Sequence, residues 1–172
     1  MTSQAPLTLV LGGARSGKSR HAEALTTSHP PPWRYVATAQ ALDEEMAERI
    51  AAHRRRRDRG WETHEVPLAL PECIARLATQ PGPILVDCLT LWLSNLMLAE
   101  LDIAAASEKL NVSLDAAIAP IVFVANEVGL GIVPENALAR RFRDEAGRLN
   151  ERLAARASRV IFMVAGLPMQ VK

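Results

Sequence analysis

The stretch that decides the fold is Gly12-Gly13-Ala14-Arg15-Ser16-Gly17-Lys18-Ser19, which matches the phosphate-binding pattern G-x-x-x-x-G-K-[ST] in full. An apolar run at residues 7–11 precedes it and a helix-forming segment at residues 18–26 follows, so a strand, a glycine loop and a helix are expected. Backbone amides of such a loop and the positive end of the helix dipole bind phosphate. We therefore predict a nucleotide-binding enzyme in which Lys18 reaches the β- and γ-phosphates and Ser19 binds Mg²⁺.

Composition and charge indicate one packed domain with a local binding site. The chain has 172 residues, 49% of them hydrophobic and 23% charged, so residues 1–172 are expected to form a single globular domain. A formal net charge of +1 gives no overall field that would recruit nucleic acid or an anionic membrane surface.

A disulfide between Cys73 and Cys88 is not expected. Residues 1–6 do not resemble a targeting segment and no apolar run approaches ~20 residues, so we expect a cytoplasmic protein without membrane insertion.

Strands and helices are expected to alternate along the chain, which predicts an α/β fold. Short apolar runs indicate strands, and apolar residues spaced by three and four indicate helices. Alternation of this kind implies a mainly parallel sheet with helices on both faces and a ligand site at the carboxyl ends of the strands, here a P-loop (RecA-like) single domain. The expected strands are residues 7–11, 34–37, 61–66, 84–87, 121–125 and 160–165, and the expected helices are 18–26, about 43 into the arginines at 54–57, 71–78, 89–101, 104–118 and 136–157.

Asp87 follows the apolar run at residues 84–86 and is the expected acidic partner of the phosphate loop. Phosphoryl-transfer sites of this class hold Mg²⁺, directly or through water, on an acidic residue at the end of a hydrophobic strand. The alternative role is a helix N-cap for the segment that begins near Leu89. Both roles are compatible with the sequence.

His53 and the arginines at residues 54–57 allow two interpretations. His53 continues the apolar stripe of Leu42, Met46 and Ile50, so it could be a packing residue, with the arginines a solvated face or a nucleic-acid patch. Alternatively, the imidazole attacks the α-phosphorus of a nucleoside triphosphate, and nearby guanidinium groups offset the growing phosphate charge. The residues alone leave this choice open.

Four segments, the phosphate loop among them, occur in a characteristic order. They are G-G-A-R-S-G-K-S-R-H-A-E at 12–23, Y-V-A-T-A-Q at 35–40, E-R-I-A-A-H at 48–53 and N-E-V-G-L-G-I-V-P-E at 126–135. Together with the long helix that follows, they resemble the bifunctional adenosylcobinamide kinase / adenosylcobinamide-phosphate guanylyltransferase family. The resemblance spans nearly the whole chain.

The resemblance implies two reactions at one site on a corrinoid substrate. The aminopropanol hydroxyl of adenosylcobinamide is phosphorylated by ATP or GTP, and GMP is then transferred from GTP to that phosphate. It implies that His53 becomes guanylylated and that the protein is a homo-oligomer, and no nucleic-acid partner is expected. Besides residues 12–19, the positions that match the GTP site of the family are Ala37, Thr38, Ala39, Arg54, Arg55, Arg56, Arg57, Glu65 and Asp87.

Two further expectations concern the path of the chain around this site. The family often has Arg-Pro where this sequence has Arg57-Asp58, so the course of the loop after His53 is left open. For His53 to reach the α-phosphorus, its helix is expected to swing or slide toward the phosphate loop. Residues 126–131 are expected either to position the corrinoid or to organise a subunit interface.

Three other functions are possible for a chain with this phosphate loop, and each would use these residues differently. A single-function small-molecule P-loop kinase would use Lys18, Ser19 and Asp87, with a structural His53. A regulatory GTP switch is disfavoured because the chain has no N-K-x-D element. A nucleic-acid-dependent ATPase is disfavoured by the near-zero net charge.

Overall fold

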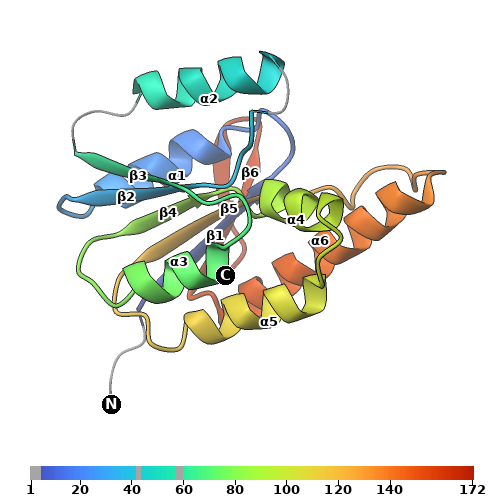
Figure 1. Ribbon diagram of the computed structural model, residues 1–172. Coiled ribbons are helices and arrows are strands. Elements are labelled where there is room, and N and C mark those ends of the chain that lie inside the picture. The colour runs from blue at the N-terminus through green and yellow to red at the C-terminus, as the bar shows by residue number, and fades with distance from the viewer. Residues whose placement is uncertain (1–4, 42–43, 57–59) are drawn as a thin grey trace.

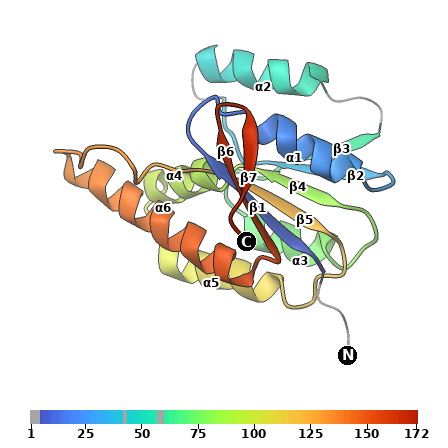
Figure 2. The ribbon, with the colours of Figure 1, turned by 180° about the vertical axis from the view of Figure 1, so that it is seen from behind.

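The computed structural model describes residues 5–41, 44–56 and 60–172, which form one sheet with helices on both faces (Figure 1, Figure 2). The strands are β1 (Leu7–Gly12), β2 (Trp33–Ala37), β3 (Trp61–Glu65), β4 (Ile84–Asp87), β5 (Ile121–Asn126), β6 (Arg159–Val164) and β7 (Leu167–Gln170). The helices are α1 (Lys18–Thr27), α2 (Glu44–Arg56), α3 (Leu70–Leu77), α4 (Leu89–Leu98), α5 (Ile103–Ser113) and α6 (Ala137–Arg156).

The sheet has the strand order β3-β2-β4-β5-β1-β6-β7. Neighbouring strands pair in parallel, except for the antiparallel pair of β6 and β7. β1 lies between β5 and β6, and its last residue, Gly12, pairs with Asn126 on one side and Met163 on the other. The α/β, mainly parallel fold predicted from the sequence is confirmed.

Each face of the sheet has its own apolar core. Figure 1 shows α1 and α2 over one face and α3 to α6 over the other. Successive residues of the central strands point to opposite faces, so Leu9 and Phe123 join the larger core under α3 to α6. Val10 and Val124 join the smaller core, which includes Ala22 of α1. Burial on both faces explains why these strands are continuous apolar runs in the sequence.

Two helices end earlier than predicted. α4 ends at Leu98 because Glu100 adopts a left-handed φ of 54°, after which the Asp102 carboxylate caps α5 by accepting from the Ala105 amide at 3.0 Å. α5 ends at Ser113 rather than near Ile118, whose amide donates instead to the Ala78 carbonyl at 2.9 Å. No helix within the described ranges is long and apolar enough to cross a membrane.

β7 has no counterpart among the predicted strands. Ala165 (φ 51°) and Gly166 (φ 83°) make the turn that reverses the chain, and left-handed backbone at an alanine gives little signal in the sequence. β7 is exposed along its length and contains Pro168, so it lacks the apolar alternation of a core strand. Proline is tolerated there because the strand lies at the edge of the sheet.

Removal of the Phe123 ring tests the packing of the larger core. Phe123 is fully buried in a central strand, so Phe123→Ala should lower the free energy of unfolding by about 3–5 kcal/mol in urea titrations. Val112→Ala, at a side chain that is 57% exposed, is the control and should change it by about 0.5 kcal/mol or less. Equal effects of the two substitutions would contradict this description of the core.

Candidate active site

The phosphate loop connects β1 to α1 and is held by close backbone contacts. A Cβ on Gly12 would lie 2.7 Å from the Met163 carbonyl oxygen, and Gly17 has a left-handed φ of 92°, so both positions favour glycine. The Gly166 amide, in the turn between β6 and β7, donates to the Ser16 carbonyl at 3.1 Å. The loop is therefore shaped by β6 and its turn as well as by its own glycines.

Lys18 lies inside this loop. Its Nζ donates to the Gly13 carbonyl at 2.5 Å and lies 3.5 Å from Ser16 Oγ, and the residue is only 7% exposed. Burial lowers the pKa of Lys18 from its usual value, while Cys88 and Asp87 oppose that shift. Residues 13–15 are exposed around the ammonium, so a phosphate that enters the loop meets a partly desolvated cation.

Asp87 ends β4 and is held by a tyrosine. The Tyr35 hydroxyl donates to Asp87 Oδ2 at 3.0 Å, and Tyr35 is 4% exposed in the smaller core. α4 begins at Leu89 with Cys88 at the N-cap position and no side-chain capping bond. The alternative role of Asp87 as a helix cap is therefore wrong, and its carboxylate is directed by Tyr35.

Thr38, just after β2, is fully buried and hydrogen-bonds to the residues at and after the end of β4. Its Oγ1 accepts from the Cys88 amide at 2.9 Å and donates to the Cys88 carbonyl at 2.7 Å, while its own amide donates to the Asp87 carbonyl at 3.3 Å. The Asn95 side chain donates to the Thr38 carbonyl at 2.8 Å and to the Pro67 carbonyl at 2.9 Å. Thr38, a position that the resemblance assigns to the GTP site, thus uses its hydroxyl to join the end of β2 to the end of β4.

Other matched positions lie along the same edge of the sheet. Ala37 pairs with Asp87 on one side and with Glu65 on the other, so these three residues are neighbours at the carboxyl ends of β4, β2 and β3. Ala39 is half-buried just beyond β2, and Glu65 is exposed. The edge that carries Asp87 therefore also carries the other strand-end positions expected from the sequence.

The end of β5 connects α4 to the phosphate loop. The Asn126 amide donates to Thr90 Oγ1 at 2.7 Å, and the Glu127 amide donates to the Gly12 carbonyl at 3.0 Å. Asn126 and Gly12 are also paired across β1 and β5. The segment that begins at Asn126 is consequently anchored on the first residue of the phosphate loop.

α2 carries His53 near its far end. The helix follows the carboxyl end of β2 and leads to Trp61, which begins β3 and pairs with Trp33 at the start of β2. His53 is one of the last four residues of α2. It therefore lies at the helix end from which the chain runs on to the amino end of β3, opposite the carboxyl edge of the sheet. Figure 1 and Figure 2 show α2 on the far side of α1 from the sheet. The movement of α2 toward the phosphate loop that we expect for His53 to reach a nucleotide stays a prediction.

The arginines after His53 are only partly covered by the structure. Arg55 is exposed on α2. Arg54 and Arg56 belong to the same helix, but their side chains and that of His53 lie outside what the structure describes. Arg57 lies outside the described residues. Their expected roles at the nucleotide remain predictions.

Several residues of this site were not expected from the sequence. Tyr35 and Asp87 are 52 positions apart, and Asn95 and Thr38 are 57 apart, so no local pattern pairs them. One signal for the Tyr35 contact was available in the sequence. Tyr35 lies two residues before the end of β2, so its side chain is on the same face of the sheet as that of Ala37, close to the carboxyl edge. Thr90 and Asn95 are polar residues in a mainly apolar helix, which is a sign of buried hydrogen bonding.

Comparison with known proteins gives consistent matches over nearly the whole chain. The family described as CobU, cobinamide kinase / cobinamide phosphate guanyltransferase, matches residues 8–171. The chain is 50% identical over 168 residues to the bifunctional adenosylcobalamin biosynthesis protein CobP of Pseudomonas aeruginosa, covering 95% of this chain and 96% of that protein. It is 44% identical to the bifunctional adenosylcobalamin biosynthesis protein CobU of Salmonella typhimurium and 42% identical to that of Escherichia coli. Each of these two alignments spans 179 residues, 95% of this chain and 98% of the relative.

The placement of Asp87 predicts a specific defect in metal response. Asp87→Asn keeps an oxygen that can accept from Tyr35 but removes the charge, so the Mg²⁺ midpoint for nucleotide binding should rise at least about tenfold. Nucleotide affinity measured in chelator should change much less. Asp115→Asn, at an exposed carboxylate, is the control. Identical Mg²⁺ titrations for Asp87→Asn and the unmodified protein would remove Asp87 from the metal site.

Proposed function

Because the chain belongs to the cobinamide kinase / cobinamide phosphate guanyltransferase family, we propose that the carboxyl edge of its sheet carries both activities. The chain is a bifunctional enzyme of cobalamin biosynthesis, a cobinamide kinase and a cobinamide-phosphate guanylyltransferase. One observation supports the location above all: a complete phosphate loop with Lys18 inside it opens at the edge where Asp87 ends β4. Adenosylcobinamide is the proposed form of the substrate.

In the kinase step, the residues of the phosphate loop hold the nucleotide while the corrinoid hydroxyl attacks the γ-phosphorus. A bond forms between the hydroxyl oxygen and phosphorus, the hydroxyl proton is released to solvent, the bond to the β-phosphate oxygen breaks, and a nucleoside diphosphate leaves. Lys18 and the loop amides offset the charge on the phosphate oxygens. ATP or GTP serves as the donor.

Mg²⁺ fits the donor atoms at this edge. Within the described part of the chain, no group of three or more His, Cys, Asp or Glu residues could enclose a metal ion. The site instead offers one carboxylate, Asp87, and one hydroxyl, Ser19, and Mg²⁺ is usually held by one or two carboxylates together with substrate phosphates and water. Ser19 and Asp87 would hold the ion, which would supply positive charge to offset the charge on the transferring phosphate. Tyr35 keeps the Asp87 carboxylate in a fixed direction for this purpose.

In the transfer step, His53 is the proposed nucleophile. An imidazole nitrogen attacks the α-phosphorus of GTP, the bond to the β-phosphate oxygen breaks, and pyrophosphate leaves. The phosphate of the corrinoid then attacks the same phosphorus, which releases His53 and gives adenosylcobinamide-GDP. Movement of α2 toward the phosphate loop brings His53 to the nucleotide.

The remaining matched positions are proposed to surround GTP. Arg54 to Arg57 follow the nucleophile and supply charge for the phosphates. Ala37 pairs with Asp87 and with Glu65 in the strand register, and Ala39 follows just beyond the end of β2, which supports a place for all three at the nucleotide. Thr38 supports the site through its bonds to Cys88.

We also propose that the protein is a homo-oligomer with no nucleic-acid partner. The net charge of +1 gives nucleic acid no electrostatic attraction. β7 and its flanks present an exposed apolar edge, with Val164, Leu167, Met169 and Val171 each about half or more exposed. Such an edge strand can pair with another chain. Sedimentation at the 18.7 kDa mass of one chain would contradict the proposal.

Lys18→Ala should slow the kinase step by about a hundredfold or more. The γ-phosphate loses its cation, and loss of such a contact to a transferring group costs roughly 3 kcal/mol or more, about a hundredfold in rate. Phosphorylation of cobinamide is the measurement, with thermal melting as a check because Lys18 is buried. Arg20→Ala, at an exposed position on α1, is the control. An unchanged rate in Lys18→Ala would refute the phosphate-loop assignment.

His53→Ala should remove GMP transfer and leave phosphorylation of cobinamide measurable. The two reactions occur at different phosphorus atoms, and only attack at the α-phosphorus needs a protein nucleophile in this mechanism. Both rates are measured on folded protein, with Glu48→Ala on the exposed side of α2 as the control. Continued GMP transfer would show that another group is the nucleophile, and loss of both rates would show that His53 serves the whole site.

A further inference from the structure

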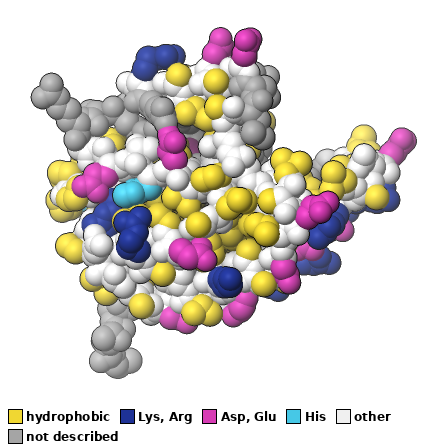
Figure 3. Space-filling model, in the orientation of Figure 1, with side chains coloured by type: hydrophobic (Ala, Val, Ile, Leu, Met, Phe, Trp, Pro, Cys, Tyr) yellow, Lys and Arg dark blue, Asp and Glu magenta, His cyan; other side chains and the backbone are white. Residues whose placement is uncertain are grey.

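A projecting segment with exposed apolar side chains begins beside the phosphate loop. We call residues 127–138, the connection from β5 to α6 and the first residues of α6, the apolar arm. Four large hydrophobic residues on it are exposed: Leu130 by 82%, Ile132 by 98%, Val133 by 57% and Leu138 by 57%. Figure 1 and Figure 2 show this segment and the start of α6 extending away from the sheet. Figure 3 shows hydrophobic side chains on its surface beside acidic and basic ones.

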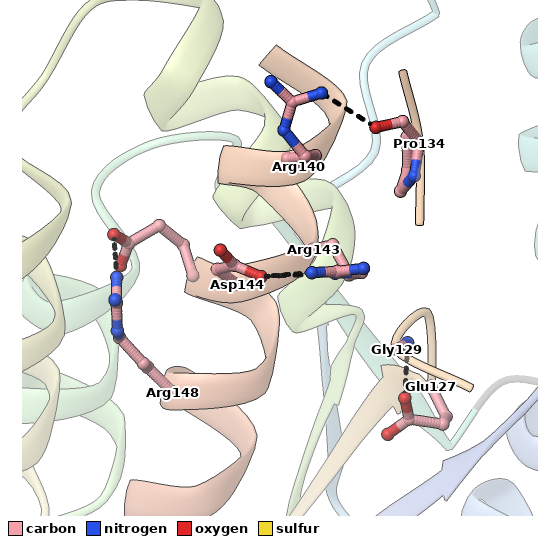
Figure 4. A network of polar contacts seen from close by, with 8 residues as sticks. Glu127, Gly129, Pro134, Arg140, Arg143, Asp144 and Arg148 are labelled. Carbon is pink, nitrogen blue, oxygen red and sulfur yellow. Dashed lines mark hydrogen bonds and ion pairs between the residues drawn. The ribbon is translucent and has the colours of Figure 1, made fainter. Parts of the chain in front are cut away.

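The arm is shaped by its own polar groups (Figure 4). Glu127 Oε1 accepts from the Gly129 amide at 2.5 Å, and the Asn136 side chain caps α6 by accepting from the Leu138 amide at 2.8 Å. Arg140 donates to the Pro134 carbonyl at 2.9 Å and also to the Glu135 carbonyl. These contacts bend the loop back onto α6. The apolar side chains are therefore presented by a defined backbone rather than by a loose tail.

The base of the arm belongs to the phosphate site. Asn126 pairs with Gly12, and the Glu127 amide donates to the Gly12 carbonyl at 3.0 Å. Val128 packs against the larger core, after which the chain leaves the body of the protein. The exposed apolar surface thus starts at the carboxyl edge of the sheet, on the side where ligands of parallel sheets bind.

We propose that the apolar arm binds the corrin ring of cobinamide while its side-chain hydroxyl lies at the phosphate loop. This inference rests on the proposed function. The hydroxyl that receives phosphate ends a short chain attached to a much wider ring, so the ring must remain outside the carboxyl edge when the hydroxyl enters. A corrin ring carries methyl groups over its faces and carboxamides on its rim. Leu130, Ile132 and Val133 offer a matching apolar contact on the segment that leaves this edge.

The backbone of the arm suits the rim of such a ring. Within the described chain, the amides of residues 130–133 donate no hydrogen bond to protein atoms. Amides free to donate can bond the carboxamide oxygens of the ligand, and apolar side chains between them cover the methyl groups. The arm therefore combines both chemistries that a corrinoid presents.

The test is a double substitution, Leu130→Ser with Ile132→Ser. Val112→Ser with Ile118→Ser is the matched control, since these residues are 57% and 65% exposed but lie on and after α5, away from the carboxyl edge. Binding of cobinamide is measured by equilibrium dialysis from its visible absorbance, which requires no catalysis. The KM for cobinamide in the kinase reaction, nucleotide affinity and sedimentation are measured on the same proteins.

The arm variant should bind cobinamide about tenfold more weakly and show a KM raised to the same extent, with nucleotide affinity and sedimented mass unchanged. The control variant should match the unmodified protein. Unchanged cobinamide binding in the arm variant overturns the proposal. A lower sedimented mass also overturns it, because the arm then contacts a second copy of the chain. If unmodified protein binds cobinamide without phosphorylating it, the proposed function fails while the dialysis comparison still decides the role of the arm.

Discussion

The parallel pairing of β1 between β5 and β6 is the constraint on which the rest of the structure depends. It places Gly12 where a side chain would meet the Met163 carbonyl at 2.7 Å, so the chain can turn into the phosphate loop only through a residue without a Cβ. The same pairing brings the end of β5 against the loop and, through β5, sets the position of β4 and Asp87. Strand register therefore fixes, on one edge of the sheet, both the Asp87 carboxylate and the start of the phosphate loop in which Lys18 lies.

Buried hydrogen bonds next to that edge hold the ends of neighbouring strands in fixed positions relative to one another. Thr38 joins the end of β2 to the peptide after Asp87, and Asn95 joins Thr38 to the segment that follows β3. Polar groups in such a place are costly unless each is paired, and here the paired groups connect three strand ends to α4. Tyr35 adds a direct bond to the Asp87 carboxylate from the opposite face of the sheet. Chemistry at the γ-phosphorus can thus rely on a rigid edge, whereas chemistry at the α-phosphorus in our mechanism requires α2 to move.

The sequence was sufficient for those features that depend on short patterns. The phosphate loop, the alternation of strands and helices, and Asp87 after an apolar run were all predicted, because each is encoded within a few residues. β7 was not, since its turn uses a left-handed alanine and its strand contains Pro168. The partners of Asp87 and Thr38 were not predicted either, because those contacts join residues 50 or more positions apart. For Thr38 the matched motif predicted a place at the GTP site, but a motif does not say whether a hydroxyl contacts a ligand or a neighbouring peptide, and here it bonds Cys88.

The covalent intermediate on His53 is the central claim, and labelling with GTP tests it most directly. Protein incubated with GTP labelled at the α-phosphate should acquire label that is lost in acid and retained in alkali, as expected for a phosphorus–nitrogen bond. GTP labelled at the γ-phosphate should leave no such label, because that phosphate departs with pyrophosphate. Absence of α-label on active protein, or α-label with the acid stability of a phosphate ester, would contradict the account.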